Sequence, residues 1–250
     1  MLAVGVAIAF IPSKIAGDKG YSKVGFYAYG LFFFLPALIQ VLTLPSRQDP
    51  TKKQFSPRGL KYLITATIML QLVILYDLYR FVIYLPITKG TGALLSAVYE
   101  LFTVALLISV ILGRKYIFSM VVYALFAARG IYGLICNVID SIGYKGEDYA
   151  SAYLFSAGEA LLSILAFALL FFIVYKYGYK ADAAIESKPK LLFYAPAIII
   201  LAEGILNFFT YPYVPINIRV LLSIVYVFYF LSIFFLGKFY YEDNPSNETI

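Results

Sequence analysis

The residues of this chain that could do chemistry are acids and an amide placed inside long apolar runs. Glu203 and Asn207 stand four positions apart, so a helix would present both on one face, and Glu159 occupies the preceding run. Two carboxylates with only an amide between them favour a cation or a proton, because an isolated negative charge is costly in apolar surroundings. The sequence therefore predicts a cation or small-solute site at Glu159, Glu203 and Asn207, built without a metal cofactor.

Further charges interrupt the neighbouring apolar runs. Asp77 and Arg80 lie in one run, while Glu100 and Arg129 lie at equal distances on either side of the short basic turn 114–115. A tight antiparallel hairpin keeps residues so placed at one level, and charges inside a membrane bundle are tolerated when they pair. We interpret Glu100, Arg129, Asp77 and Arg80 as candidates for buried ion pairs.

The depth of these charges follows from helix geometry. A rise of about 1.5 Å per residue, counted from the nearest basic loop residues, gives about 20 to 26 Å for Asp77, Glu100, Arg129, Glu159 and Glu203. The hydrocarbon core of a bilayer is about 30 Å thick, so all five are predicted in one layer beyond its midplane. Interhelical ion pairs and a functional polar cavity are both compatible with that layer.

Composition excludes several kinds of site. The chain has no histidine and one cysteine, Cys136, which removes Ser-His-Asp and Cys-His nucleophile pairs, imidazole metal ligands, iron–sulfur clusters and internal disulfides. We therefore expect neither an enzyme nor a cofactor. The net charge of +6 and the isoelectric point near 9.1 are explained by basic membrane loops, so no nucleic-acid partner is predicted.

The elements that must position these residues are membrane helices. The chain is 62% hydrophobic and 14% charged, with a mean hydropathy of +0.84. A span needs about 20 mostly apolar residues. The pattern predicts an all-α, polytopic transmembrane helix bundle of about eight helices, near 2–16, 24–44, 60–86, 94–112, 116–138, 151–175, 191–210 and 217–237. Seven spans is the alternative, because the first run is short, and Pro36 predicts a kink in the second.

The chain also divides along its length. We expect a two-helix hairpin at 1–44, a polar linker at 45–59, a six-helix body at 60–238 and a mobile tail at 239–250. The helix pairs within 94–138 and 151–210 look like weak copies of one hairpin, because Ala128-Arg129-Gly130 and Ala202-Glu203-Gly204 occupy matching places. Such internal repeats are common in transporters, and a duplicated structural hairpin is equally consistent.

Orientation is predicted from the basic residues. Twelve Lys and Arg residues fall on the side of the loops after the second, fourth and sixth helices and of the C-terminal tail. The opposite side has five: Lys14, Lys19, Lys23, Lys89 and Lys145. The excess predicts a multi-pass protein of the cell membrane with both termini cytoplasmic. The lipid bilayer is the expected partner, and other membrane subunits or a second copy of the chain are the candidates for protein contact.

Two resemblances to known families can be given. Residues 11–42 follow the pattern I-P-x-x-I-A-x-x-K-G-x-S, then Y-G and P-A-L-I, and this resembles the K-G-x-S two-helix module of small clostridial-type membrane proteins. Residues 97–240, through YELFTVALLISVILGRK and RVLLSIVYVFYF, are similar to a bacterial four-helix membrane family. The family's basic S-K-R-V-K ending is absent, since this chain reads FFLGKFYYED. Neither resemblance implies an activity.

Two functions are compatible with these features. A non-catalytic accessory or scaffold subunit of a membrane assembly fits the short loops and the Phe- and Tyr-rich surfaces. A small gradient-driven transporter of a cation or small solute fits the acidic layer and the internal repeat. The first is the leading expectation and the second its alternative.

Overall fold

The structure is a computed structural model that describes the backbone of residues 2–47, 56–84, 91–113, 115–143, 147–179, 189–210 and 216–242. The side chains at 2–8, 57, 77–84, 91–100, 147–151 and 217 lie outside that description. The chain divides into two compact units, Met1–Pro57 and Arg58–Ile250. Each unit is described by itself below.

The described residues are helical apart from their turns and contain no strand, which confirms the all-α helix bundle. The N-terminal unit holds α1 (Leu2–Asp18), α2 (Lys23–Phe32) and α3 (Phe34–Thr43). The C-terminal unit holds α4 (Pro57–Tyr84), α5 (Thr91–Leu112), α6 (Tyr116–Gly143), α7 (Glu147–Ile173), a π-helical turn η1 (Val174–Tyr179), α8 (Lys190–Thr210) and α9 (Ile216–Glu242). If α2 and α3 are counted as one broken helix, these elements match the eight predicted runs.

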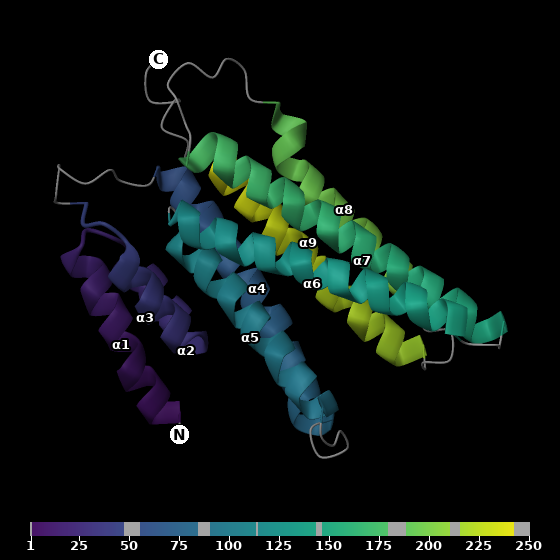
Figure 1. Cartoon of the computed structure of the whole chain (residues 1–250). Helices are drawn as coiled ribbons and strands as arrows, with labels where there is room; N and C mark the ends of the chain where they lie inside the picture. The colour runs from purple at the N-terminus through teal and green to yellow at the C-terminus, as the bar shows by residue number, and fades with distance from the viewer. Residues whose placement is uncertain are drawn as a thin grey trace. The chain divides into compact units, whose positions relative to one another are not determined.

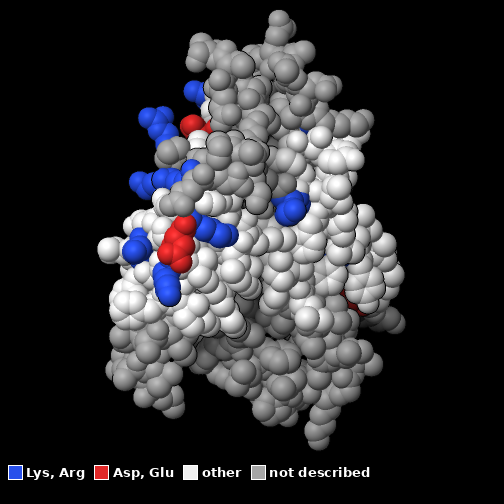
Figure 2. Space-filling view, turned by 90° about the vertical axis from the view of Figure 1, so that its left-hand side faces the viewer, with Lys and Arg blue, Asp and Glu red and all other residues white. Residues whose placement is uncertain are grey.

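Five of the described helical segments are long and apolar enough to cross a membrane. They are Arg58–Tyr76, Tyr116–Gly143, Ala152–Tyr179, Lys190–Thr210 and Ile218–Glu242. A helix satisfies its backbone hydrogen bonds internally, which is the requirement for a segment surrounded by lipid. Uncharged residues also make up most of the described surface on the face drawn in Figure 2.

The N-terminal unit is organised by a tight turn between α1 and α2. Gly20 has φ +82°, a left-handed conformation that glycine adopts without steric cost. Ser22 then begins α2, because its Oγ accepts a hydrogen bond from the Gly25 amide at 3.1 Å. Lys19 donates from Nζ to three carbonyl oxygens at the end of α3, those of Val41, Leu42 and Leu44, at 2.8, 2.9 and 2.7 Å. One side chain of the turn therefore caps α3.

In the C-terminal unit the helices from α5 to α9 each pack against the next one in the chain, and α6 to α9 run side by side (Figure 1). Glycines allow close approach: a Cβ at Gly130 of α6 would lie 2.6 Å from Ile164 Cγ1 of α7. Ser232 of α9 donates a 3.0 Å hydrogen bond to the Ala66 carbonyl of α4. The hydroxyls of Tyr123 and Tyr240 lie 3.1 Å apart and join α6 to α9.

Three boundaries differ from the sequence-based expectation. Instead of a kink at Pro36, the second run breaks completely at Phe33, where φ is −141° and ψ is 62°. Proline has no N–H, and its ring collides with the carbonyl four residues earlier, so the helix restarts with Pro36 in its first turn, where proline is tolerated. The two halves are α2 and α3.

The predicted mobile tail, 239–250, begins too early. The helix α9 continues to Glu242, and Phe239 and Tyr240 are buried. Their rings pack against the bundle, so the apolar surface they bury keeps the last turn helical. Residues 243–250 lie outside the described residues.

The predicted linker, 45–59, is also wrong at both of its ends. Tyr21 donates to the Pro45 carbonyl at 2.7 Å, and the Arg47 amide donates to the Lys19 carbonyl at 2.9 Å. At the other end, α4 already begins at Pro57. The Tyr21 hydroxyl as donor and the Lys19 carbonyl as acceptor hold 45–47 against the hairpin, and residues 48–55 are outside the described part of the chain.

Candidate functional site

The structure brings Glu159 of α7 against the last turns of α8. Asn207 Nδ2 donates to Glu159 Oε2 at 3.0 Å, and Thr210 Oγ1 donates to Glu159 Oε1. The Thr210 hydroxyl also lies 3.0 Å from the Leu206 carbonyl oxygen. A hydroxyl has one hydrogen, so Thr210 serves one of these two acceptors at a time. Both carboxylate oxygens of Glu159 are thus oriented by neutral groups of the neighbouring helix.

Glu203 stands one helical turn before Asn207 on α8. Its side chain is half-buried, and its Oε2 atom is buried without a hydrogen-bond partner. The charges of Glu159 and Arg129 act on it electrostatically. The predicted site residues Glu159, Glu203 and Asn207 therefore lie together, and the carboxylate of Glu203 is the member that the described protein leaves unsatisfied.

Arg129 reaches this region from α6. The neighbouring Gly130 packs close to Ile164 and to the Ala160 carbonyl, which brings α6 near the stretch of α7 that carries Glu159. The Arg129 guanidinium carbon lies 5.6 Å from the centre of the Phe126 ring. The positive charge of Arg129 therefore acts on the acidic residues of α7 and α8, in addition to any contact with Glu100.

Arg219 flanks the same end of α8 from the first turn of α9. Its guanidinium carbon lies 5.3 Å from the centre of the Phe208 ring, which is next to Asn207 in the chain. Its Nε atom is buried without a hydrogen-bond partner. A planar cation over an aromatic face is a stable arrangement, and it leaves this donor unused.

Other predicted site residues fall outside what is described. The side chains of Asp77, Arg80 and Glu100 lie outside the described residues, so the buried ion pairs expected among these three residues and Arg129 stay predictions. Conversely, sequence reasoning missed Thr210. Positions 203, 207 and 210 share one helix face at i, i+4 and i+7, and that polar stripe was the available signal.

The chemistry of the site is that of carboxylates, hydrogen-bond donors and charge. The Glu159 carboxylate of α7 accepts hydrogen bonds from an amide and a hydroxyl of α8, and Arg129 supplies one positive charge. Among the described residues, no three His, Cys, Asp or Glu side chains form a group that could hold a metal ion. The arrangement suits a proton or one monovalent cation better than a tightly coordinated transition metal.

Comparison with known proteins finds no match among protein families, curated proteins or solved structures. The two resemblances drawn from the sequence patterns therefore stay predictions.

Proposed function

We propose that this chain is a small, non-catalytic membrane transporter that takes one monovalent cation or proton at Glu159 and Glu203. The observation that carries the proposal is the Glu203 carboxylate, whose Oε2 atom is buried and has no hydrogen-bond partner within the described residues. An ionisable group inside a membrane-length helix is expensive to keep unless function needs it, and here it faces a second acid.

The charge balance supports a positively charged ligand. Glu159 and Glu203 contribute two negative charges, and Arg129 is the one cation acting on Glu203. Glu159, Glu203 and Arg129 together therefore carry one excess negative charge in surroundings that disfavour it, while the second cation of this region, Arg219, lies over the Phe208 ring. One proton or one monovalent cation restores neutrality. An anion would add to the negative charge, and a divalent cation would leave an excess positive charge.

The position of the site along α8 favours exchange of the ligand with one side of the membrane. Thr210 is the last residue of α8, and Glu203 lies about 10 Å before it, at about 1.5 Å per residue. From Lys190, at the other end, the distance to Glu203 is about 20 Å. A ligand therefore has a short route from the Thr210 end and a long barrier toward the Lys190 end.

We place the chain in the cell membrane with both termini cytoplasmic, in accordance with its twelve-to-five distribution of basic residues. The accessory-subunit function stays a prediction. The exposed apolar side chains of α6, such as Ile131, Ile135 and Ile142, would suit lipid as well as a partner helix, so they favour neither.

The proposal is tested by flux into liposomes that contain the purified full chain. A pH gradient, a sodium gradient and a potassium gradient are imposed in turn, and internal pH or cation content is followed with a fluorescent reporter. We expect one gradient to drive uptake, and Glu203→Gln and Glu159→Gln to reduce it at least tenfold. The control is Asp140→Asn, which removes an exposed acid at the end of α6 and should leave flux unchanged. Absence of flux under all three gradients, or equal flux in the three variants, would refute the proposal.

A further inference from the structure

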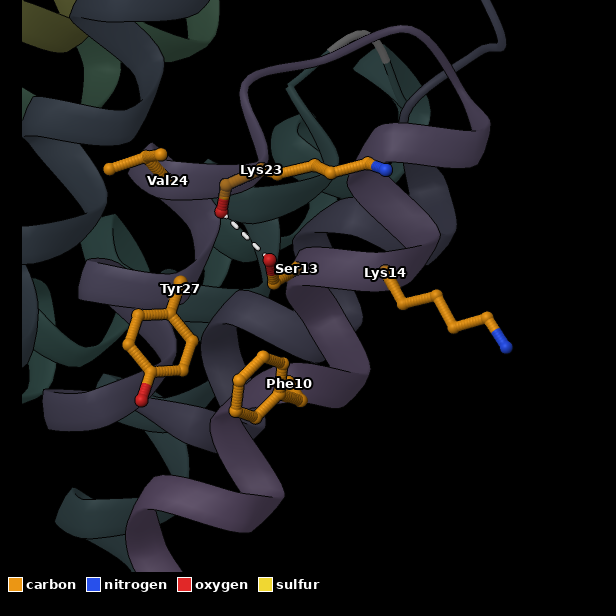
Figure 3. A pocket seen from close by; sticks show the side chains of 6 residues that line it. All are labelled: Phe10, Ser13, Lys14, Lys23, Val24 and Tyr27. Atoms are coloured by element: carbon orange, nitrogen blue, oxygen red, sulfur yellow. Dashed lines mark hydrogen bonds between the residues drawn. The ribbon is translucent and has the colours of Figure 1, made fainter.

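A groove lies between α1 and α2 at the turn end of the N-terminal hairpin. It has a volume of about 450 Å³ and is lined by Phe10, Ser13, Lys14, Lys23, Val24 and Tyr27 (Figure 3). Three of these side chains are aromatic or aliphatic and two carry positive charge. The groove therefore combines an apolar wall with cations, and neither the acidic site nor the proposed transport uses it.

The walls of the groove are held by contacts between the two helices. Ser13 Oγ donates to the Lys23 carbonyl at 2.8 Å, and the rings of Phe10 and Tyr27 lie 4.9 Å apart. A Cβ at Gly17 would collide with the aliphatic stem of Lys23. The absence of a side chain at Gly17 thus lets Lys23 lie across α1, toward the side where Lys14 projects. Figure 3 shows both ammonium groups extending to the same side of the hairpin, away from Val24 and Tyr27, so the two cations lie at one edge of the apolar groove.

The two lysines of the groove are not neutralised. Lys14 and Lys23 form no ion pair or hydrogen bond through Nζ within the described residues, and both are exposed. Asp18 stands four residues after Lys14 and pairs with neither of them. The other cations of this end are engaged: Lys19 caps α3, and Arg47 lies 4.8 Å over the Tyr21 ring. Two positive charges are therefore available to an anion.

We propose that this groove binds an anionic phospholipid. The phosphate lies between Lys14 and Lys23, and an acyl chain follows Phe10, Val24 and Tyr27 away from the turn. Phe10 is 61% exposed and Val24 79% exposed, so the groove presents an apolar surface that free phosphate would leave uncovered. Lysines beside an aromatic and aliphatic wall match a ligand with an anionic head and an apolar tail.

The position of the charges along the hairpin fits this ligand. Lys14 lies in the last turns of α1 and Lys23 is the first residue of α2, so both cations are at the turn end. Phe10 and Tyr27 stand one helical turn further from that end. A phospholipid has the same order across a membrane interface, because its charged head lies at the membrane surface and its apolar tail lies deeper.

The test measures lipid bound to the full chain in mild detergent by native mass spectrometry. Dioleoyl-phosphatidylglycerol and dioleoyl-phosphatidylcholine are added at equal concentration. Each lysine near an anionic lipid contributes roughly fivefold to binding, so we expect two lysines to give a preference for phosphatidylglycerol of about twenty-fivefold. Lys14→Gln/Lys23→Gln should abolish the preference, and Phe10→Ser should weaken the binding of both lipids.

The matched control is Lys61→Gln/Lys115→Gln, which removes two exposed lysines of the C-terminal unit and should keep the preference. Equal binding of the two lipids, or the same loss in both double variants, would overturn the proposal. Inorganic phosphate at millimolar concentration is added as a competitor. Displacement of the lipid by phosphate would also overturn it, because it would assign the lysines to a free anion.

Discussion

Lys19 in the N-terminal unit and Glu203 in the C-terminal unit are both charged side chains among apolar helices, and they are satisfied differently. The Lys19 ammonium uses its three hydrogens on three carbonyls at the end of α3. Glu203 keeps a buried carboxylate oxygen without a hydrogen-bond partner and lies near a second acid. Lys19 supplies hydrogen bonds that the end of α3 needs, whereas the Oε2 atom of Glu203 makes no hydrogen bond within the described protein.

The difference separates a charge that the fold explains from one that it does not. A cation at a helix C-terminus satisfies carbonyls that would otherwise lack donors, so Lys19 is explained by the fold alone. A carboxylate in the middle of α8 satisfies no helix end. In the transporter that we propose, a ligand supplies the positive charge that Glu203 lacks.

The largest expected effect is on the acidic site. Arg129→Gln should lower the free energy of unfolding by about 3 kcal/mol, because it leaves Glu203 beside Glu159 without a cation. Adding Glu203→Gln should recover part of that loss. Equilibrium unfolding of the four variants of this cycle in detergent measures the coupling, and Arg58→Gln, at an exposed arginine of α4, is the control. Additive effects within about 0.5 kcal/mol would assign Arg129 to another partner, such as Glu100.

A smaller effect is expected at the capping lysine. Lys19→Met keeps the aliphatic stem and removes three charged hydrogen bonds, so we expect a loss of about 2 kcal/mol from the hairpin. Proteolysis near residues 45–47 should accelerate as the end of α3 frays. Lys14→Met is the control, since its ammonium binds no described residue. Equal protease resistance in both variants would show that the carbonyls find other donors.

A substitution in the turn between α1 and α2 should have a smaller effect on the stability of the hairpin. Gly20→Ala forces an L side chain into φ +82°, and should destabilise the hairpin by about 1 kcal/mol. Gly143→Ala is the matched control, because an added Cβ there meets no atom within 4 Å and alanine favours the helix. Thermal unfolding in detergent compares the two. A stabilised Gly20→Ala variant would contradict the left-handed turn.

The smallest effect is expected from removing the hairpin. Deletion of residues 1–56 should leave a folded and monodisperse C-terminal unit, with an unchanged effect of Arg129→Gln, because the chain divides at Pro57. Size-exclusion chromatography and thermal unfolding of the shortened chain measure this. Aggregation or loss of the transition would show that the hairpin completes the core of the larger unit.

Helix positions were predictable because each apolar run is long and bounded by polar loops. The break at Phe33 was not, since a proline signals disruption without fixing where the chain leaves the helix. The role of Lys19 was also hidden: counting loop charges treats every lysine as a free cation, whereas this ammonium is bonded within the hairpin. Glu159, Glu203 and Asn207 could be grouped from their spacing, but the hydroxyl of Thr210 depends on how α7 and α8 are staggered.

The glycines of the last two helices constrain how the acidic site can move. An added Cβ at Gly237 would collide with the Phe193 carbonyl, and one at Gly204 would press on the Tyr226 side chain, so α8 and α9 approach closely at both places. Rotation of α8 against α9 would bring side chains into these two contacts. On its other side, the last turns of α8 meet α7 through polar groups, where Glu159 contacts Asn207 and Thr210. We therefore expect any motion that exposes Glu203 to move α8 and α9 together.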